Sequence, residues 1–460
     1  MIERLRRWSL AHVGVVFLFV ACTFTYYGQL HRTQSGDVYG TVYTAVALVE
    51  KQTIWLDSYL PYIQERSGEQ PYMLTTSSSG HVVTATPTAS SVLAVPAVAL
   101  FALAGVHAGD FGAWLEAGML TAALAGAATV ALLFVLLTRL TTRPRALLIS
   151  ATYAWGTIAW GINAQALWQH GGVALSLTVA LIALVDRRLA LAGAALTAMA
   201  AFRLTTPFIA ICLLPLVGRR PRDWGRFLLG AVPLPLALAT YNVAAFGSPL
   251  KQGYGTGHIQ ASLQVSGRVF EGLAGLLIAP GRGLFVYSPV LLFAVVGAVR
   301  GRRVALYRAA AAAIVLYILV TANVQQWWGG ESFGPRKLSD ILPLFALLLV
   351  PAIDLLARPL WRRIFVIALA WSVLVELLAA AAWPTHWFDT HDLTRFSTWW
   401  NPWDNEVVDM LTSGSTWPRV AWMVLIAASG LVAAALAQWT WSSLARRPAV
   451  NTSLPARPRS

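Results

Sequence analysis

The sequence predicts an all-α polytopic membrane protein with about 12 transmembrane helices, between roughly 11 and 13. The composition is 57% hydrophobic and only 12% charged, whereas soluble domains carry about 25% charged residues. Apolar stretches of about 20 residues, each long enough to cross a hydrocarbon core of about 30 Å, recur from Trp8 to Trp441. The net charge of +14 comes from arginine clusters between these stretches. This arrangement follows the positive-inside rule and argues against nucleic-acid binding.

If the basic clusters all face the cytoplasm, one of the first three apolar stretches does not cross the membrane. They lie near 8–27, 88–106 and 113–138, between the clusters that contain Arg7 and Arg139. An even number of crossings must separate two clusters on the same side. The stretch 90–106 follows a Thr/Ser-rich entry and contains Pro96. We therefore expect it to lie along the outer membrane face, as a helix parallel to the membrane.

The remaining crossings follow from the later apolar stretches, and they place both ends of the chain in the cytoplasm. They are expected near 146–164, 170–186, 189–202, 205–218, 227–246, 284–299, 304–322, 338–357, 363–382 and 418–441. The chain then divides into a first helix (1–27), a first outer loop (28–112), a transmembrane core (113–357), a C-terminal pair of helices (358–441) and a cytoplasmic tail (442–460). The other outward polar segments are 247–283, 323–337 and the Trp-rich loop 383–417.

Asp37 is the first candidate for chemistry, because it is a lone acid just beyond the first span. An acid at the membrane edge can meet both a lipid-borne and a water-borne substrate, and it can serve as a general base. The alternative is that Asp37 only caps the helix that begins near Val38.

Arg203 interrupts an apolar stretch, where a charge is costly unless it faces a cavity or an anion. A clamp for a lipid phosphate is the functional interpretation. A snorkelling arginine at the end of a span is the alternative.

Two glycine-containing segments add further basic residues. Arg336 and Lys337 end the run 327–337 and suit a phosphate, and Arg282 lies in the turn 280–283. The same run contains Trp327, Trp328 and Glu331, which suit a sugar face and its hydroxyls. An aromatic belt followed by a basic span end is the alternative interpretation.

Further candidates for binding a sugar or an acceptor are Tyr39 and His81 in the first outer loop, and Trp399 and Trp400 in the loop 383–417. Flat aromatic faces beside hydrogen-bonding acids are typical of carbohydrate sites. No tight His/Cys/Asp/Glu spacing indicates a metal site. We expect no cofactor, and a divalent metal is left open as the less favoured case.

In their order along the chain, these features resemble polytopic glycosyltransferases of the GT-C type, in particular the protein O-mannosyltransferase and lipid A aminoarabinose transferase group. The resemblance covers most of residues 1–345. The segments that carry it are Asp37-Val38-Tyr39, the Pro87 segment, 203–207, Tyr241-Asn242, 246–249, 282–285 and 327–336. Many members have a second acid beside the first, and that position is Val38 here.

The resemblance implies an inverting transfer of a sugar from a polyprenyl phosphate to a glycan, lipid or protein acceptor. The transfer would take place on the outer face of a bacterial cytoplasmic membrane. Asp37 would be the base, and Arg203 would contact the lipid phosphate. The rival hypothesis is a transporter or flippase for a lipid-linked or anionic solute, because interrupted helices and intramembrane charges are also typical of transporters.

Overall fold

The computed structural model describes residues 2–30, 36–69, 71–253, 264–383 and 387–445, and it is mostly helical. In chain order the helices are α1 (Ile2–Tyr27), a 3₁₀ helix (Gly36–Val38), α2 (Tyr39–Lys51), α3 (Leu60–Ser67), α4 (Ala89–Leu103), α5 (Phe111–Leu137), α6 (Arg143–Trp155), a π-helix (Ala159–Asn163), α7 (Gln169–Val185), α8 (Leu189–Phe202), α9 (Pro207–Leu213), a 3₁₀ helix (Leu214–Val217), α10 (Pro221–Ala231), α11 (Pro233–Phe246), α13 (Val269–Ile278), α14 (Leu284–Tyr287), a 3₁₀ helix (Pro289–Leu291), α15 (Leu292–Arg300), α16 (Ala305–Ala322), a 3₁₀ helix (Arg336–Ile341), α17 (Leu342–Leu349), a 3₁₀ helix (Val350–Ala357), α18 (Pro359–Ala382), α19 (Trp387–Thr390), a 3₁₀ helix (Phe396–Trp400), α20 (Glu406–Thr412) and α21 (Thr416–Ala445). Two short strands, β1 (Leu74–Thr76) and β2 (Val82–Thr84), pair antiparallel.

Several of these helices have the length and composition of membrane spans, so the chain is a multi-pass membrane protein. Among the described residues, 6 helical segments are long and apolar enough to cross a bilayer. They are Phe111–Leu137, Pro221–Phe246, Ala305–Ala322, Arg336–Ala357, Pro359–Ala382 and Thr416–Leu436. Shorter apolar helices, such as α4, α7 and α8, accompany them.

The apolar stretches read from the sequence correspond closely to helices in some places and less closely in others. The stretches 113–138 and 189–202 become α5 and α8. The stretch 146–164 is not one helix, because α6 ends at Trp155, with Gly156 as its C-cap, and a short π-helix follows. In 338–357, 3₁₀ turns flank α17. The segment predicted to lie on the membrane face forms α4, whose 15 residues rise only about 22 Å.

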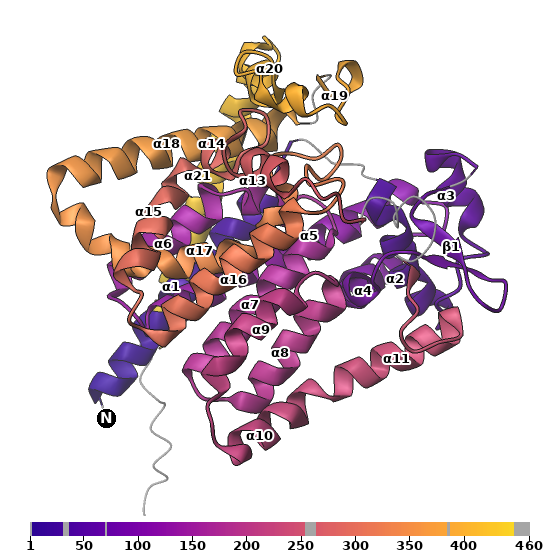
Figure 1. Cartoon of the computed structure of the whole chain (residues 1–460), viewed down its shortest axis with the longest axis horizontal. Helices are drawn as coiled ribbons and strands as arrows, with labels where there is room; N and C mark the ends of the chain where they lie inside the picture. Colours follow the sequence, from indigo (N-terminus) through magenta and orange to yellow (C-terminus); the bar gives the residue numbers. More distant parts are fainter. Residues whose placement is uncertain (1, 31–35, 70, 254–263, 384–386, 446–460) are drawn as a thin grey trace, which may run out of the picture.

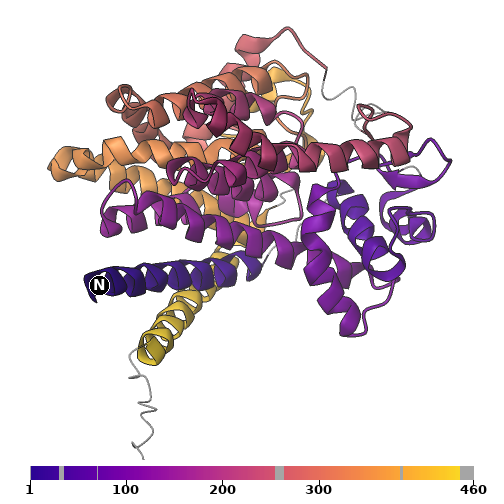
Figure 2. The ribbon, with the colours of Figure 1, turned by 90° about the horizontal axis from the view of Figure 1, so that it is seen from below.

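The bundle has a basic end and an opposite end that carries the candidate site. At the basic end, Arg139 pairs with Asp186 at 2.6 Å, where α5 and α7 finish. At the other end, α7 begins beside His170 and α8 finishes beside Arg203. Figure 1 shows α20 at one extreme of the molecule and α10 at the other. In Figure 2 the segment from α2 to α4 is gathered at the end of the bundle away from the N-terminus.

The most enclosed spans hold the centre of the bundle. In Phe111–Leu137, 72% of the apolar window is buried inside the protein, and in Arg336–Ala357 the share is 78%. The corresponding value is 17% for Pro221–Phe246, whose apolar side chains, such as Leu229 and Leu236, remain exposed. Exposed apolar helices suit contact with lipid, whereas the enclosed span that starts at Arg336 carries the polar groups described next.

Candidate functional site

Asp37 lies at the start of the site, in the 3₁₀ helix that leads into α2. Its Oδ2 atom is 2.7 Å from Arg336 Nη1, although 299 positions separate the two residues in the chain. The Tyr72 hydroxyl donates a hydrogen bond to Oδ1 at 2.6 Å. The N-cap position of α2 is Val38, so the simple helix-cap alternative is not favoured for Asp37.

The environment of Asp37 favours its ionised form. Partial burial works to raise its pKa, but Arg336 and the hydrogen bonds from Tyr72 and Arg336 outweigh burial and hold the pKa below its usual value. The Asp37 side chain is 31% exposed and that of Arg336 is 17% exposed. The carboxylate is thus charged at neutral pH and still reachable from solvent.

Arg336 is held on several sides. Its Nη2 atom donates to the Gly329 carbonyl at 2.7 Å, and its backbone N–H donates to the Gly334 carbonyl at 2.8 Å. Its guanidinium lies 5.2 Å from the centre of the Trp168 ring, a cation–π distance. These contacts fix the arginine that faces Asp37.

A second polar cluster lies where α7, α8, α16 and the 3₁₀ helix Arg336–Ile341 meet. Asp340 is fully buried and accepts hydrogen bonds from the Tyr317 hydroxyl and from His170 at Nδ1, 2.8 Å away. Arg203 Nε lies 3.1 Å from the other carboxylate oxygen, and the Arg203 side chain is 15% exposed. A buried carboxylate with three partners of this kind is well compensated, and its loss would leave Arg203 without its counter-charge.

Lys337 completes the basic side of the site. It is half-buried and is repelled by the charges of both Arg203 and Arg336. Among the described residues no hydrogen bond or ion pair engages its ammonium group. Lys337 thus adds a third basic side chain beside Arg203 and Arg336, whose guanidinium groups pair with the carboxylates of Asp340 and Asp37. A partly buried amine next to two arginines suits an anionic ligand, because the ligand compensates a positive charge on the amine.

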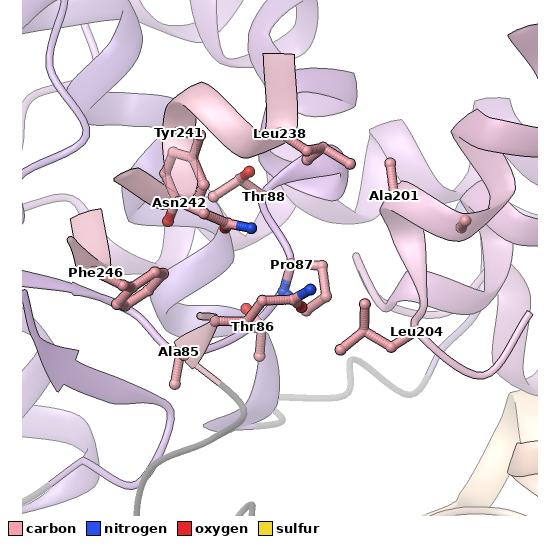
Figure 3. A pocket seen from close by; sticks show the side chains of 13 residues that line it. Ala85, Thr86, Pro87, Thr88, Ala201, Leu204, Leu238, Tyr241, Asn242 and Phe246 are labelled. Atoms are coloured by element: carbon pink, nitrogen blue, oxygen red, sulfur yellow. The ribbon is translucent and has the colours of Figure 1, made fainter. Parts of the chain in front are cut away.

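A recess opens beside Arg203, between α8, α11 and the segment 85–88 (Figure 3). Its walls are mostly apolar, with polar groups from Thr86, Thr88, Tyr241 and Asn242. Leu204, the residue after Arg203, is part of the lining. Four segments that the sequence singled out (Pro87, 203–207, Tyr241-Asn242 and 246–249) each contribute to this recess.

Arg282 lies apart from the Asp37 pair. It is fully buried, and it donates hydrogen bonds to the carbonyls of Gly330, Ser332 and Gly334. Its charge partner is the buried Glu406, at 3.6 Å. Direct contact of Arg282 with a lipid phosphate stays a prediction, and in this structure its donors serve the glycine-containing loop.

The predicted sugar-binding tryptophans are packed against each other. The Trp327, Trp328 and Trp399 side chains are at most 8% exposed, and Trp327 meets Trp328 edge-on with 5.8 Å between ring centres. Trp400 packs on Phe396 nearby. The structure does not bring these rings to the Asp37 pair as an open platform.

The other predicted contact residues are dispersed. Tyr39 is buried against Phe111. His81 is half-exposed, stacked on Trp55 and paired with Asp57 at 3.1 Å. Glu331 is exposed at the tip of the glycine-containing loop.

Sequence reasoning missed Tyr72, His170 and Asp340, which complete the two polar clusters. Two of them could have been found from the sequence, because His170 is the first residue of the apolar stretch 170–186 and Asp340 lies near the start of the stretch 338–357. An ionisable group inside a span marks a functional site by default. Tyr72, in a polar segment with many similar residues, gave none.

Comparisons of the chain with known proteins identify no relative. No group of three or more His, Cys, Asp or Glu side chains within the described ranges is arranged to hold a metal ion. Neither a family model, nor a curated protein, nor a solved structure matches the chain. The fold and the site define a multi-pass helical membrane protein with a paired acid and a basic cluster at one end of its bundle.

Proposed function

We propose that this protein is a membrane glycosyltransferase of the GT-C type that moves a sugar from a polyprenyl phosphate to an acceptor, with inversion. The observation that carries the proposal is the contact between Asp37 and Arg336. It joins an acid of the first outer loop to the arginine at which the most enclosed span begins. Arg203 and Lys337 lie in the same region, so a proton acceptor and a phosphate-binding cluster are neighbours.

The reaction follows from these groups. The acceptor hydroxyl oxygen attacks the anomeric carbon, and its proton passes to Asp37. The bond between that carbon and the phosphate oxygen breaks, and the electron pair leaves with the phosphate. Lys337 and Arg203 stabilise the negative charge on the leaving phosphate, an electrostatic contribution of a few kcal/mol for each well-placed donor.

Arg336 makes donor binding precede proton transfer to Asp37. While it is paired with Asp37, it makes the carboxylate a weak proton acceptor. An incoming phosphate competes for the same guanidinium, which binds phosphate as readily as carboxylate. Donor binding would thereby free Asp37 to accept the proton of the acceptor hydroxyl. Asp37 would then be a poor base until the donor is bound.

The proposed topology has about 12 crossings, with the site on the outer face of a bacterial cytoplasmic membrane. One feature supports this orientation. Arginine-rich ends with exposed ion pairs, such as Arg145–Asp354, gather at the end of the bundle opposite Asp37. The positive-inside rule assigns that end to the cytoplasm. The recess beside Arg203 has mostly apolar walls, which are compatible with contact to a prenyl chain.

The test uses purified protein in liposomes with a panel of undecaprenyl-phosphate hexoses, pentoses and aminopentoses, and a cell-envelope fraction as the acceptor source. Release of undecaprenyl phosphate is measured for wild type, Asp37→Asn and the surface control Asp354→Asn, whose side chain is 60% exposed. We expect release by wild type and the control, and a loss of at least about 100-fold in Asp37→Asn. Equal release by Asp37→Asn would refute the base assignment, and no release from any donor would refute the transferase.

One observation favours the rival transporter hypothesis. Glu376 is fully buried in α18, and its Oε2 accepts a hydrogen bond from Gly161 N–H of the π-helix at 2.9 Å. Its Oε1 atom and both polar atoms of the buried Gln165 have no hydrogen-bond partner in the described part of the chain. Buried acids beside irregular helices are typical of transport paths. Glu376-dependent movement of fluorescent undecaprenyl phosphate across liposomes, without sugar transfer, would favour this alternative.

A further inference from the structure

The loop 329–334 fixes the position of Arg336 through two hydrogen bonds. The Gly329 carbonyl accepts from Arg336 Nη2, and the Gly334 carbonyl accepts from the Arg336 backbone N–H. Gly334 has a φ of +52°, a region that other residues rarely adopt. The carbonyl groups that hold Arg336 are therefore set by the shape of this loop.

Arg282 and Glu406 hold the inner side of the same loop. Arg282 Nη2 donates to the Gly330 carbonyl at 2.8 Å, and Nη1 donates to the Gly334 carbonyl at 2.9 Å. Glu406 Oε1 accepts from the Gly334 N–H at 2.8 Å. Gly334 is thus held by Arg282 at its carbonyl and by Glu406 at its amide. The same carbonyl also accepts the hydrogen bond from the Arg336 backbone N–H.

Glu406 belongs to the segment 387–417, and Arg282 packs on that segment through Trp399. Glu406 begins α20, and its Oε2 accepts from Trp383 Nε1 at 3.2 Å. The Arg282 guanidinium lies 4.5 Å from the centre of the Trp399 ring, and Gly281 N–H donates to the Trp399 carbonyl at 3.0 Å. A chain of direct contacts therefore runs from α20 to Gly334, then to Arg336 and Asp37.

We propose that Arg282 and Glu406 are positioning residues that hold Arg336 against Asp37, so that the segment 387–417, which contains Trp399 and α20, sets the geometry of the site. Its catalytic consequence rests on the proposed function, whereas the geometric coupling does not. A fully buried ion pair is a poor means of stabilisation, because desolvation offsets its attraction, and apolar residues of the same volume would serve as well. The fork of an arginine can instead hold several carbonyls at fixed directions.

The experiment compares Glu406→Gln with the matched control Glu271→Gln. Gln keeps the shape and one acceptor oxygen of Glu406 but removes its charge. Glu271 supports the same aromatic cluster through Trp327 Nε1 at 3.4 Å and is 24% exposed, but it makes none of the contacts to Gly334 given above. Purified wild type and variants are labelled with a water-soluble carbodiimide across a pH series, and modification of Asp37 is followed by peptide mass spectrometry. Carbodiimides react with the protonated carboxyl, so the labelling midpoint reports how firmly Arg336 is held against Asp37.

Hydrogen exchange of the peptide 329–337 is the second readout. In Glu406→Gln we expect exchange about tenfold faster than in wild type, because a charge-assisted hydrogen bond is weakened. We also expect the Asp37 labelling midpoint to move to higher pH. Neither change is expected in Glu271→Gln. A folded Glu406→Gln protein with the wild-type midpoint would overturn the proposal, since a purely structural role does not alter the titration of a distant carboxyl.

A milder variant decides the matter if Glu406→Gln does not fold. Trp383→Phe removes the hydrogen bond to Glu406 Oε2 and trims a buried ring, but it leaves Glu406 and its contact with Gly334 in place. An upward shift of the Asp37 midpoint in this variant supports the coupling, and an unchanged midpoint overturns it. Because neither readout needs a sugar donor, a failed transfer assay would refute the proposed function while leaving this result interpretable.

Discussion

Replacing Arg336 with methionine removes the guanidinium from Asp37 while keeping an unbranched side chain of similar length. In wild type the pKa of Asp37 is lowered because Arg336 and the hydrogen bonds outweigh burial. Without Arg336, burial becomes the dominant influence, with Tyr72 opposing it and His170 contributing only if protonated. The pKa of Asp37 should therefore rise in Arg336→Met.

The size of this effect follows from the geometry of the pair. Two unit charges about 4 Å apart interact by about 4 kcal/mol at an effective dielectric constant of about 20. Solvent reaches both side chains, which are 31% and 17% exposed, so we expect about 1–2 kcal/mol after screening. That corresponds to a proton affinity of Asp37 roughly 5- to 30-fold higher in the variant.

The carbodiimide labelling described above measures this change at the residue itself. Arg268→Met is the control, because Arg268 is 71% exposed and pairs only loosely with Glu271, at 3.8 Å. The Asp37 midpoint should lie below the usual aspartate range in wild type and in the control, and higher in Arg336→Met. In wild type, the lowered pKa makes Asp37 stabilising above its unfolded-state value, and this contribution disappears as the pH falls through the folded value. An identical midpoint in wild type and Arg336→Met would refute the assigned role of the pair.

Three further substitutions test the packing around the site, each by thermal unfolding in detergent. Asp340→Asn removes the buried counter-charge of Arg203 and should cost about 3–5 kcal/mol; an unchanged midpoint would mean that the cluster is already neutral. Trp399→Ala empties a fully buried position and should cost about 3–5 kcal/mol, whereas an open sugar platform would tolerate it. Gly334→Ala places a methyl group 2.9 Å from the Tyr287 ring at a φ of +52° and should cost at least about 1 kcal/mol; equal stability would contradict the proposed rigidity of the loop.

Much of the helical scaffold was predictable, because continuous apolar runs must be helical in lipid. The run 189–202 gave α8 to the residue, since Arg188 and Arg203 bound it on both sides. The run 146–164 was harder, because Gly156 ends α6 without interrupting the hydropathy. A short hairpin (β1 and β2) was missed because each strand has only 3 residues.

The site was predictable only in part. Asp37 could be singled out as a lone acid just beyond the first apolar stretch, and Arg336 and Lys337 as the basic end of the glycine-containing run 327–337. Their pairing could not, because no local pattern connects residues 299 positions apart. The sequence also gave no means to separate Arg282 and Trp399, which are buried, from exposed ligand-binding residues of the same types. Burial depends on how distant segments pack, and neither hydropathy nor spacing reports it.

The measurement that tests the central claim most directly is native mass spectrometry of the protein purified in mild detergent, with undecaprenyl phosphate as the added ligand. Wild type, Arg203→Ala and the exposed control Arg268→Ala are compared. The account predicts bound polyprenyl phosphate in wild type and in the control, and its loss in Arg203→Ala. Absence of binding in wild type, or equal binding by all three proteins, would contradict the assignment of the basic cluster to a lipid phosphate.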